Sequence, residues 1–153
     1  PRVTHTAIWT GSEMIVWGGD SKNGFVGSGG RYCACTELVA PSGTPSLTVT
    51  QSASVTSLAW PSVAAARGYD VVRGALDTLL SSNGDFTAAT GACLSSNGAG
   101  LTAQDSVVPP AGNGTWYLVR ARNCRGTGSY DDSGAGLVAS RDAEILASAN
   151  HCP

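Results

Sequence analysis

The segment from Thr115 to Gly134 constrains the fold of this chain more than any other segment does. Its first part places two sets of side chains on opposite faces of an extended chain, namely Tyr117, Val119 and Ala121 on one face and Leu118, Arg120 and Arg122 on the other. A repeat of two residues over this length predicts a β-strand with one face on a core and the other largely in water. A cysteine and a cluster of glycine, serine and aspartate follow, which indicates that the strand ends in a sharp turn.

The composition of the 153 residues agrees with an all-β protein. Only 13% of the residues are charged and 20 are glycine, as expected of short strands joined by frequent turns. The apolar fraction of 42% and the lack of any block of like charge argue against a disordered chain.

Charge and hydropathy exclude two classes of partner. With Lys22 as its one lysine and a net charge of −2, the chain has no basic surface for nucleic acid. No apolar run approaches the roughly 20 residues that a membrane-spanning helix requires. No signal peptide is recognisable, and we expect Pro1 to begin a piece that was processed or excised from a longer precursor.

Five cysteines in so short a chain favour an oxidising compartment, so we expect an extracellular or cell-surface protein. The expected first disulfide joins Cys93 to Cys124, because both residues end strand-like segments. Cys152 is expected to bond either Cys33 or Cys35. Since five is an odd number, one thiol is left over, either free or bonded to another chain.

Composition divides the chain into four expected regions. They are a β-hairpin arm (1–32), a linker rich in Cys, Pro and Gly (33–45), a β-sandwich (46–140) and a tail tied by Cys152 (141–153). In the arm, the apolar runs HTAIW and EMIVWGG flank Thr10-Gly11-Ser12, which predicts a hairpin. In the linker, two prolines and a glycine interrupt any regular element.

Strand signals recur at short spacing after the linker. The expected strands are SLTVTQ, VTSLAW, GYDVVRG, FTAATGAC, LTAQDSVV, TWYLVRARN and GLVASRDAEI, while LDTLL is ambiguous. The turn markers between them are Asn83-Gly84, Asn97-Gly98, Pro109-Pro110 and Asn113-Gly114. About seven short strands with turns at this spacing predict a two-sheet sandwich.

The arm resembles one kelch-type propeller repeat. The double glycine Gly18-Gly19 and the later run Gly29-Gly30-Arg31-Tyr32 carry this resemblance. A kelch repeat is one blade of a propeller, and a blade cannot bury its faces alone. Because the chain contains one such copy, the resemblance implies no ring, no central channel and no binding residues that can be carried over.

Residues Pro45 to Ser140 resemble fibronectin type III domains. On this resemblance, Trp60 matches the core tryptophan of the second strand, and Tyr69 to Arg73 match the third strand. Tyr117 matches the tyrosine of the sixth strand that hydrogen-bonds back to the chain. The resemblance implies a fibronectin type III- or immunoglobulin-like sandwich that works outside the cell without catalysis.

The C-terminal tail is similar to the ends of large secreted bacterial proteins that carry such domains after kelch-like repeats. The segment from Arg141 to Ile145 and the final Cys152-Pro153 carry this similarity. The five cysteines depart from the common fibronectin type III pattern, which has none. This departure favours the secreted subfamily and leaves the pairing open.

The sequence gives little support for a catalytic function. A nucleophilic serine or cysteine needs a nearby base, and the histidines are His5 and His151, close to opposite ends of the chain. No G-x-S-x-G motif is present. We therefore expect a protein that is not an enzyme and carries no cofactor.

Metal binding is also disfavoured. One set of zinc-type ligands consists of Cys33, Cys35, His151 and Cys152. C-x-C with H-C is not a standard zinc spacing, so disulfides are the favoured interpretation. Asp131 and Asp132 are weak candidates for calcium, but a solvated turn closed by side-chain oxygens is favoured there.

Carbohydrate binding requires exposed aromatic side chains in a planar row. Trp60 is expected in the core, whereas Trp9, Trp17 and Trp116 are expected to pack together where the arm meets the sandwich. The sequon Asn113-Gly114-Thr115 adds a glycan as a further candidate partner.

The incomplete arm supports the main functional expectation. Its unpaired strand edges accompany apolar side chains that lack a second layer, namely Ile8, Trp9, Met14, Ile15, Val16 and Trp17. Proteins cover such edges or use them to pair with another chain. We expect the arm to dock on another copy or on its parent assembly, so that repeated head-to-tail contacts build a filament.

Two alternatives stay open. In the first, the arm folds back on its own sandwich and the chain is a monomeric terminal module. In the second, the chain is a ligand- or carbohydrate-binding accessory module of a larger secreted protein.

Overall fold

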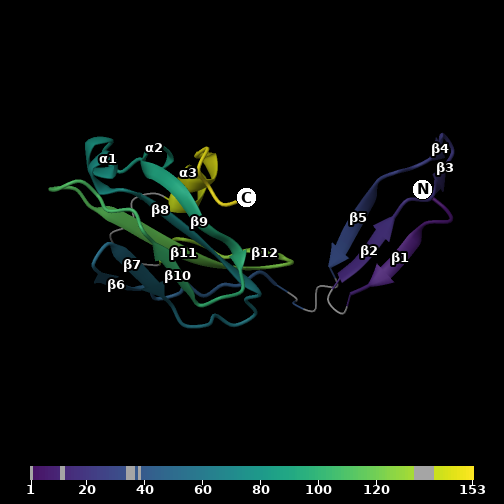
Figure 1. Cartoon of the computed structure of the whole chain (residues 1–153), viewed down its shortest axis with the longest axis horizontal. Coiled ribbons are helices and arrows are strands. Elements are labelled where there is room, and N and C mark those ends of the chain that lie inside the picture. The colour runs from purple at the N-terminus through teal and green to yellow at the C-terminus, as the bar shows by residue number, and fades with distance from the viewer. Residues whose placement is uncertain (1, 11–12, 34–36, 38, 133–139) are drawn as a thin grey trace. The chain divides into compact units, whose positions relative to one another are not determined.

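The structure is a computed structural model that describes residues 2–10, 13–33, 37, 39–132 and 140–153. The chain divides into two compact units, unit 1 (Pro1–Leu38) and unit 2 (Val39–Pro153) (Figure 1). The division falls inside the segment 33–45 that the sequence predicts as a linker. Pro41 and Pro45 are buried, so the second half of that segment packs as part of unit 2.

Unit 2 is a sandwich of two antiparallel sheets. The first sheet has the order β10-β7-β6, with β6 at Thr48–Ser52, β7 at Val55–Ala59 and β10 at Thr102–Asp105. The second has the order β12-β11-β8-β9, with β8 at Gly68–Ala75, β9 at Thr90–Gly98, β11 at Thr115–Asn123 and β12 at Gly126–Thr127. The predicted fold class, an all-β sandwich of about seven strands, is therefore confirmed.

The main core lies between these two sheets. Its buried members are Leu58, Trp60, Tyr69, Val71, Val119 and Ala121. Trp60 directly follows β7 and is 5% exposed, and its ring centroid lies 5.7 Å from that of Tyr69. The Tyr69 hydroxyl accepts a hydrogen bond of 2.8 Å from the backbone N–H of Val63, so this buried ring keeps its polar atom satisfied.

A second core covers the opposite face of the sheet β12-β11-β8-β9. It contains Val72, Tyr130, Ile145 and Cys152, with Phe86, Trp116 and Leu118 packed against them. In Figure 1, the helices α2 (Phe86–Ala89) and α3 (Arg141–Ala147) lie on this side, away from β6, β7 and β10. The prediction that the Leu118, Arg120 and Arg122 face of β11 lies largely in water is therefore wrong, because a helical layer and the C-terminal segment cover it.

Three segments that the sequence left ambiguous or assigned to strands are helical. LDTLL forms α1 (Leu76–Ser81), and the start of FTAATGAC forms α2. The Asp85 carboxylate accepts the backbone N–H groups of Thr87 and Ala88, which is a standard helix N-cap. The RDAEI part of the last predicted strand forms α3, and residues 133–139 before it lie outside the described part of the chain.

Unit 1 contains a sheet of three strands in the order β1-β2-β5 and a small hairpin. The sheet is built from β1 (Thr6–Trp9), β2 (Glu13–Trp17) and β5 (Gly29–Cys33), and the hairpin from β3 (Asp20–Ser21) and β4 (Gly24–Phe25). The predicted pairing of β1 with β2 is confirmed, although the arm is a three-stranded sheet and not a hairpin alone. No residue of unit 1 whose burial is described is buried.

Candidate functional site

The sheet of unit 1 presents apolar side chains on both faces. The strand register places Trp9, Met14 and Tyr32 side by side in one row, and Ala7, Val16 and Gly30 side by side in the next. Because side chains alternate along a strand, these two rows share one face of the sheet. We call this surface, formed by Ala7, Trp9, Met14, Val16, Gly30 and Tyr32, the first face.

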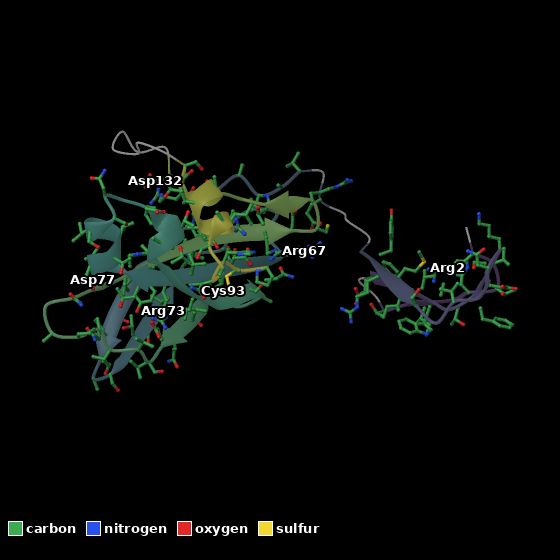
Figure 2. The ribbon with its side chains drawn as sticks, turned by 90° about the horizontal axis from the view of Figure 1, so that it is seen from above. Arg2, Arg67, Arg73, Asp77, Cys93 and Asp132 are labelled. Atoms are coloured by element: carbon green, nitrogen blue, oxygen red, sulfur yellow. A yellow bond between two sulfur atoms is a disulfide. The ribbon has the colours of Figure 1, made fainter. Side chains whose placement is uncertain are left out.

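The first face has a row of large side chains (Trp9, Met14 and Tyr32), a row of smaller residues (Ala7, Val16 and Gly30) and a hollow. Trp9 is 56% exposed and Tyr32 is 67% exposed, so both rings project from the large row. Beside them lies a hollow of about 330 Å³, lined by Met14, Val16, Gly30, Tyr32 and neighbouring residues. Arg2 (labelled in Figure 2) also lines this hollow and donates from Nη1 to the carbonyl oxygens of Gly18 and Ser28.

The opposite surface carries apolar and charged side chains together. It consists of Thr6, Ile8, Glu13, Ile15, Trp17, Gly29 and Arg31, and we call it the second face. The Trp17 ring lies across Gly29, where an added Cβ would come within 2.2 Å of a ring carbon. Arg31 and Glu13 form an ion pair of 3.6 Å in which the arginine side chain stays 73% exposed.

The six predicted association residues divide between these faces. Trp9, Met14 and Val16 belong to the first face, whereas Ile8, Ile15 and Trp17 belong to the second. Trp9 and Trp17 therefore do not pack together as predicted. Trp116 instead packs against Phe86 in unit 2, with ring centroids 5.1 Å apart.

The structure adds β5 to the surface, which sequence reasoning missed. Tyr32 and Gly30 lie in the run GGRY, which carries the resemblance to a kelch-type repeat but did not by itself predict a strand of this surface. The alternation of a glycine and a large aromatic residue two positions later was the available signal, because residues i and i+2 share one face of a strand.

The disulfide pairing differs from the prediction. Cys93 (labelled in Figure 2) bonds Cys152 and not Cys124. Cys124 is also disulfide-bonded, but to neither of these two residues. Cys152 is 2% exposed and belongs to the second core, so its bond to β9 fastens the C-terminal segment onto the sheet. The predicted pairing of Cys152 with Cys33 or Cys35 is therefore wrong. Cys35 and the side chain of Cys33 lie outside the described part of the chain.

A buried charge cluster lies beneath this C-terminal segment. Asp70 on β8 is fully buried and pairs with Arg120 Nη2 and Arg122 Nη1, each at 3.1 Å. It also accepts the backbone N–H of Asn97 at 2.9 Å. The Arg120 guanidinium lies 4.6 Å from the centre of the Tyr130 ring, and burial raises the pKa of that tyrosine. Every oxygen of this carboxylate is thus engaged in holding the fold together.

A second polar cluster joins the two sheets near one end of the sandwich. The Tyr117 hydroxyl donates to Asp105 Oδ2 at 3.0 Å, and Arg73 Nε lies 3.5 Å from the same oxygen. Partial burial, followed by the nearby Asp105 carboxylate, raises the pKa of Tyr117. Tyr117 therefore bonds an acidic side chain on β10, and the tyrosine bonded to the backbone is Tyr69.

The candidate calcium ligands are engaged by an arginine. Asp131 accepts the backbone N–H and Nε of Arg141 at 2.9 and 3.1 Å, and Ser140 Oγ at 2.7 Å. Asp132 lies 3.3 Å from Nη2 of the same arginine. Partial burial alone raises the pKa of Asp131, but these hydrogen bonds and the arginine charge bring it below its ordinary value. The cluster caps the start of α3 and presents a guanidinium where a cation would have to bind.

Ligand groups for metals or catalysis do not gather elsewhere in the described residues. No three histidine, cysteine, aspartate or glutamate side chains in that part of the chain are grouped to hold a metal ion. His5 is exposed in unit 1, while His151 Nδ1 lies 2.6 Å from the Ser148 carbonyl oxygen in unit 2. Among the same residues, no helix has the length and apolar character needed to cross a bilayer.

Comparison with known proteins adds no relative to this description. No protein family, no curated protein and no solved structure matches the chain. The surface of unit 1 is therefore the candidate functional site on geometric grounds alone.

Proposed function

We propose that this protein is a non-enzymatic structural module of an extracellular or cell-surface assembly and associates with copies of itself through unit 1. One observation carries the proposal. Unit 1 has no buried residue among those described, yet its sheet exposes large apolar side chains on both faces.

A three-stranded sheet gains stability by placing at least one apolar face against another layer. Val3, Ile8, Trp9, Trp17 and Tyr32 are each more than half exposed in unit 1. Covering this area in a partner contributes about 25 cal/mol for each Å² removed from water. Since the two faces point in opposite directions, contacts on both extend an assembly and do not close it, which yields a filament.

The proposed compartment rests on the cysteines. The Cys93–Cys152 bond and the disulfide of Cys124 are the kind of crosslink that persists outside the cytosol. For unit 2 we propose a fibronectin type III-like module, supported by the sheet orders β10-β7-β6 and β12-β11-β8-β9 and by the buried Trp60. The bond from Tyr117 to a side chain departs from that family pattern.

The test is sedimentation velocity of the oxidised full chain over a wide range of concentration. Self-association predicts a weight-average mass that rises with concentration. The double variant Trp9→Ser and Trp17→Ser, which changes both faces, is expected to remain monomeric. Phe25→Ser is the matched control, because Phe25 is 95% exposed in unit 1 but lies in β4 outside the three-stranded sheet. A wild-type chain that is monomeric throughout contradicts the proposal.

One observation favours a second candidate function, a carbohydrate-binding accessory module. Trp9 and Tyr32 lie in the same row of the first face, on either side of Met14, and both rings are exposed. Such a pair offers two apolar surfaces on which sugar rings can stack. Retardation in gels that contain soluble polysaccharide, lost in Trp9→Ala, is the expected result for this function. A monomeric chain with that retardation would favour it over self-association.

A further inference from the structure

We propose that the first face is a two-fold interface, on which a second copy of this chain packs with its large row over the small row of the first. This inference rests on the proposed function, because it assumes that unit 1 is the site of self-association. It specifies which face is used, in which orientation, and which residues meet.

The strand register makes the first face complementary to itself. Its large row is Trp9–Met14–Tyr32, and its small row is Ala7–Val16–Gly30. Consider a two-fold axis that lies midway between the two facing sheets and runs perpendicular to their strands. Rotation about this axis places the large row of each copy over the small row of the other. Trp9 then lies over the partner's Ala7, Met14 over the partner's Val16, and Tyr32 over the partner's Gly30. Facing sheets pack about 10 Å apart, and alternation of large and small side chains fills that space.

The hollow lies where this arrangement needs space. It is lined by Met14, Val16, Gly30 and Tyr32 of the first face together with Arg2, Gly29 and Arg31, and its volume of about 330 Å³ exceeds that of a tyrosine side chain. A Cβ added at Gly30 would find no atom of its own chain within 4 Å. The floor of the hollow is therefore open to a side chain from outside. Arg2 at its rim presents a cation that can meet an aromatic face.

Charge selects the first face over the second. None of the six residues of the first face is Asp, Glu, His, Lys or Arg, and Arg2, which lines the hollow, donates from Nη1 to backbone carbonyl oxygens. The second face carries Glu13 and Arg31, and the arginine side chain is 73% exposed. Burying that ion pair in a dimer would remove two charges from water, a cost that its attraction often fails to recover.

The available area sets the expected strength. With 56% of Trp9 and 67% of Tyr32 exposed, these two rings offer roughly 300 Å² per copy. With the smaller side chains, a dimer buries about 900 Å² in total, close to the ~1,000 Å² that marks the lower end of specific interfaces. The expected interface is weak and reversible. A two-fold contact through the first face alone gives a dimer, so the proposed filament requires a further contact through the second face.

The decisive variant fills the hollow. A Cβ at Gly30 meets no atom of its own chain within 4 Å, and the side chain of Gly30→Leu occupies the position of the partner's Tyr32, so we expect the association to weaken roughly ten- to hundredfold. Gly27→Leu is the matched control, since a Cβ at Gly27 also meets no atom within 4 Å and Gly27 lies outside the three-stranded sheet. The double variant Gly30→Leu with Tyr32→Ala removes the clashing ring and is expected to recover part of the lost affinity.

Folding of the variants is checked by the indole N–H signal of Trp17 in NMR spectra, because Trp17 lies on the second face and should not shift. A monomeric wild-type chain overturns both this inference and the proposed function. If the wild type associates but Gly30→Leu behaves like Gly27→Leu, the interface is wrong while self-association stands. If Gly30→Leu dissociates the chain but removal of Tyr32 recovers nothing, the pairing of Tyr32 with Gly30 is wrong.

Discussion

Unit 1 and unit 2 are both built of antiparallel strands, but they differ in what covers their sheets. On β8 of unit 2, the neighbours Val71 and Val72 point to opposite faces and are both fully buried. On β2 of unit 1, Val16 and Trp17 likewise point to opposite faces, yet neither is buried and Trp17 is 60% exposed. A strand with apolar residues on both faces is thus buried in unit 2 and left exposed in unit 1.

This difference teaches that a strand with apolar residues on both faces belongs in the middle of three layers. Unit 2 supplies the outer layers itself, one from β6, β7 and β10 and one from α2, α3 and the C-terminal segment. The described part of unit 1 supplies only the middle layer. The proposed partner sheets are the missing layers.

The largest expected effect in unit 2 is at Asp70. Asp70→Ala leaves the Arg120 and Arg122 guanidinium groups beneath the C-terminal segment without their carboxylate, so we expect a loss of about 3–5 kcal/mol in unfolding free energy. Denaturant unfolding followed by tryptophan fluorescence measures it. Asp77→Asn on α1 is the control, because this exposed residue should cost less than about 0.5 kcal/mol. Equal losses for the two variants would mean that the outer layer of unit 2 is not held by the buried charges.

The next effect compares the two units directly. Leu58→Ala removes a side chain that is 1% exposed between the sheets and should cost about 2–5 kcal/mol. Ile8→Ala removes one that is 58% exposed on the second face, and in dilute monomer it should cost less than about 0.5 kcal/mol. Amide hydrogen exchange gives a second readout, with slow exchange expected in β7 and fast exchange in β1. A large loss for Ile8→Ala in the monomer would show that unit 1 already has a cover within its own chain.

Local sequence pattern was sufficient to predict several strands in both units. The alternation of β11, the Trp60 position and the pairing of β1 with β2 all follow from side chains within a few residues of each other, and the structure has them. The exposure of the Arg120 face was mispredicted, since its cover comes from α3 and Cys152, which are distant in sequence. The sequence pattern of an alternating strand does not show whether its arginine side chain lies in water or pairs with a buried aspartate.

The candidate site was predictable only in part. The apolar residues of β1 and β2 were recognised, but their division between two faces requires the register of the two strands, and the first face also includes Gly30 and Tyr32 of the unrecognised strand β5. The disulfide pairing required knowledge of which distant segments meet, because Cys93 and Cys152 are separated by 59 residues. Spacing along the chain carries no such information.

A smaller effect, dependent on pH, tests how the outer layer of unit 2 is attached. Because the pKa of Asp131 is lowered in the folded protein, its contribution is present above the ordinary value of 3.8 and is lost as the pH falls through the lowered pKa. Asp131→Asn should reduce the unfolding free energy by up to about 1 kcal/mol at pH 7, and the difference from wild type should shrink below pH 3.8. Asp132→Asn, at a side chain that is 69% exposed, should change it little. A difference that stays constant with pH would exclude a role for the Asp131 charge.

The smallest expected effect has the opposite sign. Tyr130 is 2% exposed, and its hydroxyl has no hydrogen-bond partner among the described residues. An unpaired buried hydroxyl is destabilising, so Tyr130→Phe should raise the unfolding free energy by about 0.5–1 kcal/mol while its ring stays beside Arg120. Tyr69→Phe is the matched control, because it leaves the Val63 N–H without its acceptor and should lower the unfolding free energy by about 1 kcal/mol. If both variants lose stability, the Tyr130 hydroxyl is satisfied by a buried water, and the outer layer of unit 2 is closed by polar contacts as well as by apolar packing.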